Sequence, residues 1–159
     1  MNSGWLILAR VIHVLGVVVW IGGVGFVTAV LLPAVRTFDD PARRAEVFER
    51  LESRFAWIAR GATLIVGASG FYMVFQFNLW ARFSSVAYWW MHAMVAVWVI
   101  FTVMLFIAEP FFLRRRFSEQ LRLNPERTLS RIQRTHWLLL ILSLIAAAGA
   151  VAGAHGYEF

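Results

Sequence analysis

The stretch Arg10–Gly23, RVIHVLGVVVWIGG, decides the fold class of this protein. It sets an arginine and a histidine inside an apolar run that extends from about Trp5 to Leu32. A helix that crosses a membrane needs about 20 apolar residues, because the hydrocarbon core is about 30 Å thick and each residue adds about 1.5 Å. The run is long enough to cross a bilayer, so its two polar side chains need a physical explanation.

Three further apolar segments have the same character, at residues 55–77, 86–108 and 137–154. Of the 159 residues, 60% are hydrophobic and only 15% are charged, and the mean hydropathy is +0.68. The connecting segments are short and polar, so they hide no soluble domain. We therefore expect one all-α domain over residues 1–159, a transmembrane four-helix bundle.

The distribution of arginine predicts the orientation of this bundle, since the chain has no lysine. Two loops hold nearly all of the basic residues, and positive residues favour the cytoplasmic side. We expect both loops in the cytoplasm and both termini outside, in a cytoplasmic (inner) membrane of bacterial type. The net charge of +6 is then a topology signal, with contact to anionic lipid as a secondary effect and no need for nucleic acid. The loop arginines are Arg36, Arg43, Arg44, Arg50 and Arg54 in the first and Arg114, Arg115, Arg116, Arg122, Arg127, Arg131 and Arg134 in the second.

Both predicted cytoplasmic loops carry signals for the start of a helix. Asp40-Pro41 and Asn124-Pro125 each offer an N-cap residue followed by proline at the first helical position. We therefore expect the second and fourth spans to begin as helical extensions in the cytoplasm.

Two histidines are predicted to lie at one depth in the membrane. His13 follows Trp5 by eight residues, about 12 Å from the outer surface, and His92 follows Val86 by six, about 9 Å from that surface. The first and third spans enter from the same side, so the two imidazoles can face each other across the bundle. Ionisable residues inside a membrane are costly and mark functional sites. Hydrogen-bonded packing is the plainer alternative.

The helical face of His13 predicts which residues would surround a cofactor there. Glycine lets a flat cofactor or a neighbouring helix approach closely, and tight helix packing alone would also explain such a stripe. Arg10 could neutralise a haem propionate or reach to the membrane surface. The predicted cofactor-binding residues are His13, His92, Arg10, Gly16, Trp20 and Gly23, with His155 and Met94 as further metal-ligand candidates.

The absence of cysteine restricts the chemistry of any metal site. Thiolate sites, iron–sulfur clusters and covalent haem attachment are excluded, which leaves histidine, methionine and carboxylate side chains as ligands.

Three motifs carry a resemblance to a known group: RVIHVLGVVVWIGG, ERLESRFAWIARGATLIVGASGFYMV and YWWMHAMVAVWV. They resemble the small four-span membrane proteins of the CopD-like and HemJ-like superfamily. The HemJ-like resemblance implies haem b and protoporphyrinogen oxidation; Arg10 stands where that group typically has lysine, and the third-span lysine is absent after Trp90. The CopD-like resemblance implies copper handling, with His13, His92 and Met91 or Met94 as contacts.

Three functions are therefore open. The first is a haem b protein, a membrane oxidoreductase in character, that exchanges electrons with a quinone or small substrate through His13 and His92. The second is copper transport, for which Cu(I) would favour methionine and histidine. The third is a structural membrane subunit without cofactor. The lipid bilayer is a partner in each, and the sequence leaves a homo-oligomer open.

Overall fold

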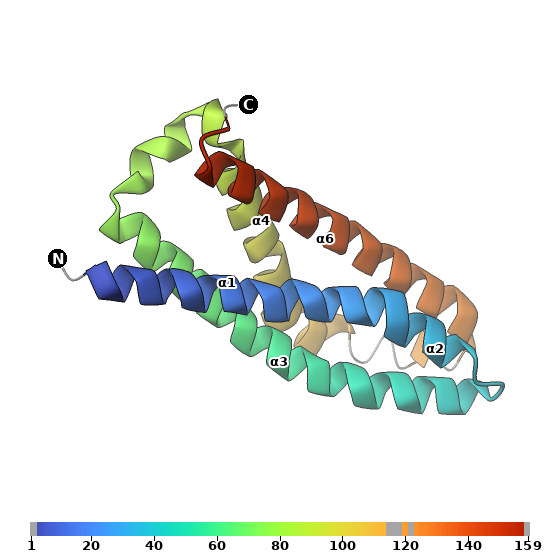
Figure 1. Cartoon of the computed structure of the whole chain (residues 1–159). Helices are drawn as coiled ribbons and strands as arrows, with labels where there is room; N and C mark the ends of the chain where they lie inside the picture. Colours follow the sequence, from blue (N-terminus) through green and yellow to red (C-terminus); the bar gives the residue numbers. More distant parts are fainter. Residues whose placement is uncertain (1–2, 114–118, 121–122, 158–159) are drawn as a thin grey trace.

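The computed structural model describes residues 3–113, 119–120 and 123–157, and every regular element among them is helical (Figure 1). Four helical stretches are long and apolar enough to cross a membrane: Gly4–Arg36, Ala42–Gln76, Val86–Phe111 and Pro125–Ala154. Within the described residues, the predicted all-α fold with four helices long and apolar enough to span a membrane is confirmed. Which side of the membrane each end faces stays a prediction, and Arg114, Arg115, Arg116 and Arg122 lie outside the described residues.

Each span is built from one or more helical elements. The first comprises α1 (Ser3–Phe26), the π-helical turn η1 (Val27–Leu31) and α2 (Leu32–Arg36). The second is α3 (Pro41–Gln76). The third comprises the 3₁₀ turn η3 (Val86–Tyr88), α4 (Trp89–Val103) and the π-helical η4 (Met104–Leu113), and the fourth is α6 (Pro125–Ala154).

The two helical extensions predicted from Asp40-Pro41 and Asn124-Pro125 are present. Asp40 caps α3 by accepting a hydrogen bond from the backbone N–H of Ala42 at 2.9 Å. Asn124 precedes α6 without a side-chain cap. Proline at the first turn of both helices costs no hydrogen bond there, because the N–H groups of a first turn have no partner within the helix.

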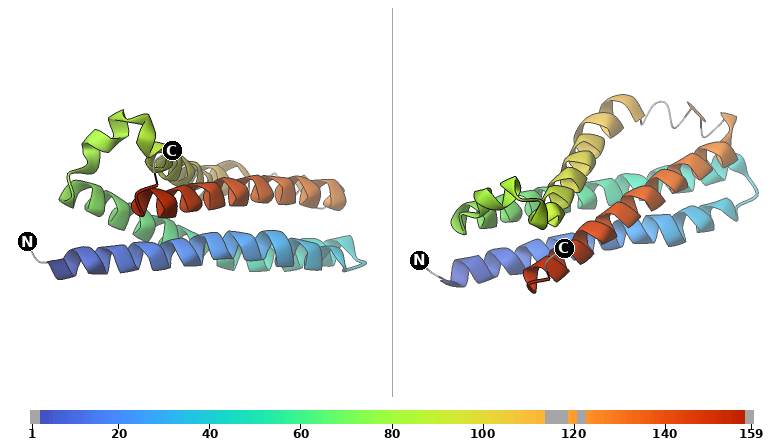
Figure 2. Two further views of the ribbon diagram at one scale, coloured as in Figure 1. Left: turned by 45° about the horizontal axis from the view of Figure 1, so that its top comes forward. Right: turned by 90° about the horizontal axis from the view of Figure 1, so that it is seen from above.

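The helices pack as two pairs. The most extensive contact joins α1 to α3, and the next joins α4 to α6. Figures 1 and 2 show α1 and α3 packed against each other in opposite directions and crossing at an angle, with α6 above them and α4 behind α6. The pairs meet in the middle of the bundle, where the edge of the Trp20 ring packs against Phe101 with 4.8 Å between ring centroids.

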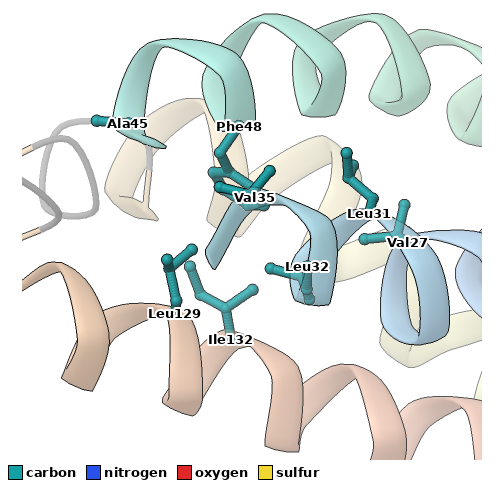
Figure 3. Packing of buried hydrophobic residues seen from close by; sticks show 8 residues of the cluster. All are labelled: Val27, Leu31, Leu32, Val35, Ala45, Phe48, Leu129 and Ile132. Atoms are coloured by element: carbon teal, nitrogen blue, oxygen red, sulfur yellow. The ribbon is translucent and has the colours of Figure 1, made fainter. Parts of the chain in front are cut away.

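A second apolar cluster closes the end of the bundle where the first two spans join. Leu32 and Val35 of α2 insert between α3 and α6 and are fully buried (Figure 3). Leu129 and Ile132 of α6 lie on the other side of them. The helical extensions therefore pack into the bundle rather than projecting from it as solvated helices.

The segment that joins the second and third spans is more structured than the expected short loop at residues 78–85. Asn78 takes a left-handed conformation with φ of 50°, which ends the helical run and reverses the chain. A 3₁₀ helix, η2 (Leu79–Ser84), follows directly. Because α4 then begins only at Trp89, His92 lies in its first turn rather than six residues deep in a helix.

Candidate functional site

His13 is held by α3. Its Nδ1 lies 3.1 Å from the backbone carbonyl oxygen of Val66 and 3.0 Å from the hydroxyl oxygen of Ser69. A Cβ at Gly70 would meet Cε1 of the same ring at 3.1 Å, so glycine there leaves room for the imidazole. The ring is therefore fixed at the interface of α1 and α3, on the two elements that pack most closely.

These contacts favour the tautomer of His13 that carries its proton on Nδ1. A carbonyl oxygen can only accept, so Nδ1 donates to Val66. The Ser69 hydroxyl has its own acceptor in the carbonyl of Ile65, 2.6 Å away, and is free to accept from Nδ1 as well. In the neutral ring, Nε2 then keeps its lone pair. Metal-binding histidines are commonly oriented in this way, with the second nitrogen donating to a carbonyl or carboxylate.

His92 is arranged in the opposite sense. Its Nε2 lies 2.9 Å from the carbonyl oxygen of Phe83, and the Phe83 ring packs edge-on against the imidazole at 5.4 Å. The carbonyl again only accepts, so here Nε2 carries the proton. The side chain is exposed at the start of α4. His13 and His92 thus make their hydrogen bonds with different elements, α3 and η2, and ligation by His92 Nε2 would require release of Phe83.

The other predicted ligands have simpler surroundings. Nδ1 of His155 donates to the Val151 carbonyl in its own helix at 2.8 Å, and the ring is exposed at the end of α6. Met94 is half-buried on α4, and Met91, three residues earlier, is buried. Among the described residues, no three histidine or carboxylate side chains gather into a metal-binding group.

Two of the predicted cofactor-binding glycines contact the chain's own side chains. A Cβ at Gly16 would meet Val66 at 2.9 Å, and one at Gly23 would meet the Phe55 ring, with Cζ at 2.7 Å. Both glycines therefore serve the packing of α1 on α3 in this structure, as the plainer explanation of the glycine stripe expects.

Arg10 and Trp20 differ in burial. Arg10 is exposed, one helical turn before His13. Trp20 is only 4% exposed, and its indole N–H has no hydrogen-bond acceptor within the described part of the chain. A buried donor without a partner costs free energy. Trp20 therefore has an indole N–H available to an acceptor, two helical turns after His13 along α1.

A charged pair that the sequence reading missed lies toward the other end of the bundle. Arg60 of α3 and Glu109 of η4 approach to 2.5 Å, and their side chains are 16% and 17% exposed. The Arg60 guanidinium also lies over the Trp57 ring, 5.0 Å from its centroid. Arg60 thus pairs with a carboxylate of another helix. Ionisable groups within a membrane are rare and usually paired.

Arg60 also supplies a hydrogen bond that the backbone of the third span lacks. Pro110 lies within the π-helical segment η4 and has no N–H to donate. In a π-helix that N–H would bond to the carbonyl five residues earlier, which is Leu105. Nε of Arg60 donates to this Leu105 carbonyl at 3.0 Å. The backbone group left open by proline is therefore satisfied from a neighbouring helix, as a membrane interior requires.

The depth of a polar residue within its expected span can be compared with the depth of its partner on the neighbouring span. His13 lies eight residues from the start of the first expected span, and Ser69 lies eight residues from the end of the second. Glu109 directly follows the third expected span, and Arg60 lies five residues inside the second. Depth therefore matches His13 with Ser69, whereas Arg60 and Glu109 differ by six residues, about 9 Å, and are not matched by depth.

The residues present fit one axial ligand of haem better than two. His13 has a fixed ring and the free Nε2 that a ligand needs, whereas Nε2 of His92 already donates a hydrogen bond to the Phe83 carbonyl. Comparison with protein-family models, curated proteins and solved structures finds no match for this chain. The resemblance to the CopD-like and HemJ-like superfamily therefore rests on the three short motifs alone.

Proposed function

We propose that this protein is an integral membrane protein that binds haem b through His13 and serves electron transfer with a quinone or another small redox substrate. The observation that carries the proposal is the pair of contacts from His13 Nδ1 to Val66 and Ser69. They leave Nε2 as a Lewis base inside an apolar span, and a neutral imidazole of this kind is a common ligand of haem iron.

The other members of the proposed site have supporting roles. Arg10, exposed one turn before His13 toward the start of α1, is suited to neutralise a propionate. Trp20 supplies a buried indole N–H that lacks an acceptor within the described residues. His92 is the proposed second ligand. Its Nε2 would bind iron only after its hydrogen bond to the Phe83 carbonyl is broken. Bound haem b would supply one-electron chemistry, and the protein would set its reactivity through these neighbours.

The absorption spectrum of the purified full chain in detergent tests this proposal, together with pyridine haemochrome and metal analysis. A Soret band and b-type haemochrome are expected, because the chain has no cysteine for covalent attachment. A low-spin spectrum that becomes high-spin in His92→Ala would assign His92 as second ligand. A high-spin spectrum unchanged by His92→Ala would leave His13 as the single protein ligand.

Two outcomes would overturn the haem proposal. A folded, colourless protein that carries stoichiometric copper would assign the second function, copper handling. A folded protein that holds neither metal nor haem, even after haem addition, would favour the structural subunit. The two results are distinguished by metal analysis of the same sample.

A further inference from the structure

The structure contains a hollow lined by arginine at the end of the bundle far from His13. It is an open depression with a volume of about 580 Å³. One face of α6 supplies its lining: Glu126, Arg127, Ser130, Arg131 and Arg134.

The arginines of this hollow are not neutralised by the protein. Arg127, Arg131 and Arg134 are exposed and make no hydrogen bond or ion pair among the described residues. The one carboxylate in the lining, Glu126, already faces Arg44 at 3.6 Å. By sequence, residues 114–118 and 121–122 add no carboxylate. The hollow therefore carries a net positive charge without a counterion from its own surroundings.

A fourth arginine, on another helix, contacts a residue that lines this hollow. Arg36 of α2 donates from Nη2 to the Ser130 hydroxyl at 3.2 Å, and Ser130 is part of the lining. The Nε of Arg36 is buried and has no acceptor within the described part of the chain. Arg36 of α2 thus adds a guanidinium group behind the arginine-lined face of α6, and planar donors of this kind suit a phosphate.

The depth of the hollow indicates a lipid. The apolar part of α6 begins at Trp137, which is 44% exposed and of a type that gathers at membrane interfaces. Arg134 and Arg131 lie about 5 Å and 9 Å before it along the helix axis. The headgroup layer occupies about 5–8 Å on each side of the hydrocarbon core. Arg134 therefore lies at the height of the lipid phosphates and Arg131 at their water-facing edge, on the side where anionic lipid and positive loops are expected together.

We propose that Arg127, Arg131 and Arg134, with Ser130 and Arg36 behind them, form a binding site for the phosphate headgroup of an anionic phospholipid. Native mass spectrometry of the detergent-solubilised full chain, titrated with phosphatidylglycerol, tests it. Phosphatidylcholine with the same acyl chains and inorganic phosphate are the comparison ligands. We expect phosphatidylglycerol to be retained and phosphatidylcholine to be lost, since only the former is anionic.

The key variant replaces Arg127, Arg131 and Arg134 by glutamine, and the matched control replaces the exposed Arg43, Arg50 and Arg54, which removes the same charge from α3. Each arginine near an anionic surface contributes about fivefold in binding, so the key variant should lose on the order of 100-fold and the control little. If the triple variant fails to fold, Arg131→Gln alone should lose about fivefold.

Three results would overturn the proposal. The first is no preference of the wild-type protein for phosphatidylglycerol. The second is equal loss of binding in both triple variants, which would show charge attraction without a site. The third is displacement of the lipid by inorganic phosphate at equal concentration, which would assign the hollow to a free phosphate. None of these readouts depends on haem.

Discussion

Nδ1 of His13 lies 3.0 Å from the hydroxyl oxygen of Ser69, so a polar side chain of the first span contacts one of the second. Ser69 is itself anchored to the Ile65 carbonyl of its own helix. The imidazole is therefore held against α3 through Nδ1, and its Nε2 makes no hydrogen bond within the described residues.

Ser69→Ala should weaken haem retention and raise its midpoint potential. Loss of a hydrogen-bond acceptor makes the imidazole a poorer donor to ferric iron, and such outer contacts are worth about 10–100-fold in metal affinity. Because the Val66 carbonyl remains, we expect about tenfold faster haem transfer to apomyoglobin. Ser143→Ala is the matched control, since Ser143 is buried on α6 and bonds only to the Leu139 carbonyl. Equal effects of both changes would show that Ser69 acts only in packing.

The pairing of Arg60 with Glu109 predicts a strongly non-additive response. Glu109→Gln leaves the guanidinium without a counterion and should lower the free energy of unfolding by about 3 kcal/mol. Replacing both residues with Arg60→Met and Glu109→Leu should recover only part of this loss, because the Leu105 carbonyl then loses the donor that Arg60 supplies. Unfolding of the single and double variants in a denaturing detergent gives the coupling energy. Additive single changes would mean that the two side chains do not interact.

Close approach of Trp98 to α3 predicts opposite effects at two glycines. A Cβ at Gly67 would lie 2.6–2.7 Å from the Trp98 ring, whose N–H donates to the Thr63 carbonyl. Gly67→Ala should therefore cost about 1–3 kcal/mol. Gly61→Ala meets nothing within 4 Å and should gain about 0.5–1 kcal/mol from its better helix propensity. Thermal unfolding followed by tryptophan fluorescence compares them, and equal shifts would contradict the observed packing.

Arginine placement predicts the orientation in the membrane. A reporter fused to the C-terminus should be active only outside the cytoplasm, and one inserted in the turn at Asp39 only inside it. Inverted activity would reverse the assignment of sides and would place the arginine-lined hollow in the outer leaflet.

The sequence was sufficient for the spans and for the helical extensions. The length of each apolar run determines the spans, and the Asp-Pro and Asn-Pro pairs mark where the helical extensions begin. It was also sufficient to find His13 as a polar residue inside a span, because a charged or polar group in hydrocarbon needs a partner.

The partners of His13 and Arg60 could not be obtained in the same way. Helix rotation and the exact start of each helix decide them, and the 3₁₀ segments before Trp89 shifted His92 into the first turn of α4. The chain's own side chains also decide what a glycine faces: Phe55 lies against Gly23, which the sequence alone assigned equally well to a cofactor. Both depend on tertiary packing rather than on local pattern.

The most direct test of the central claim is the haem content of His13→Ala measured beside His136→Ala. His136 is a matched control because its Nδ1 donates to the Ile132 carbonyl at 2.9 Å, which leaves its Nε2 free as in His13, but it lies near the opposite end of the bundle. We predict that His13→Ala loses the b-type haemochrome while His136→Ala keeps the wild-type content. Full haem content in folded His13→Ala, or loss of haem in His136→Ala alone, would contradict the account.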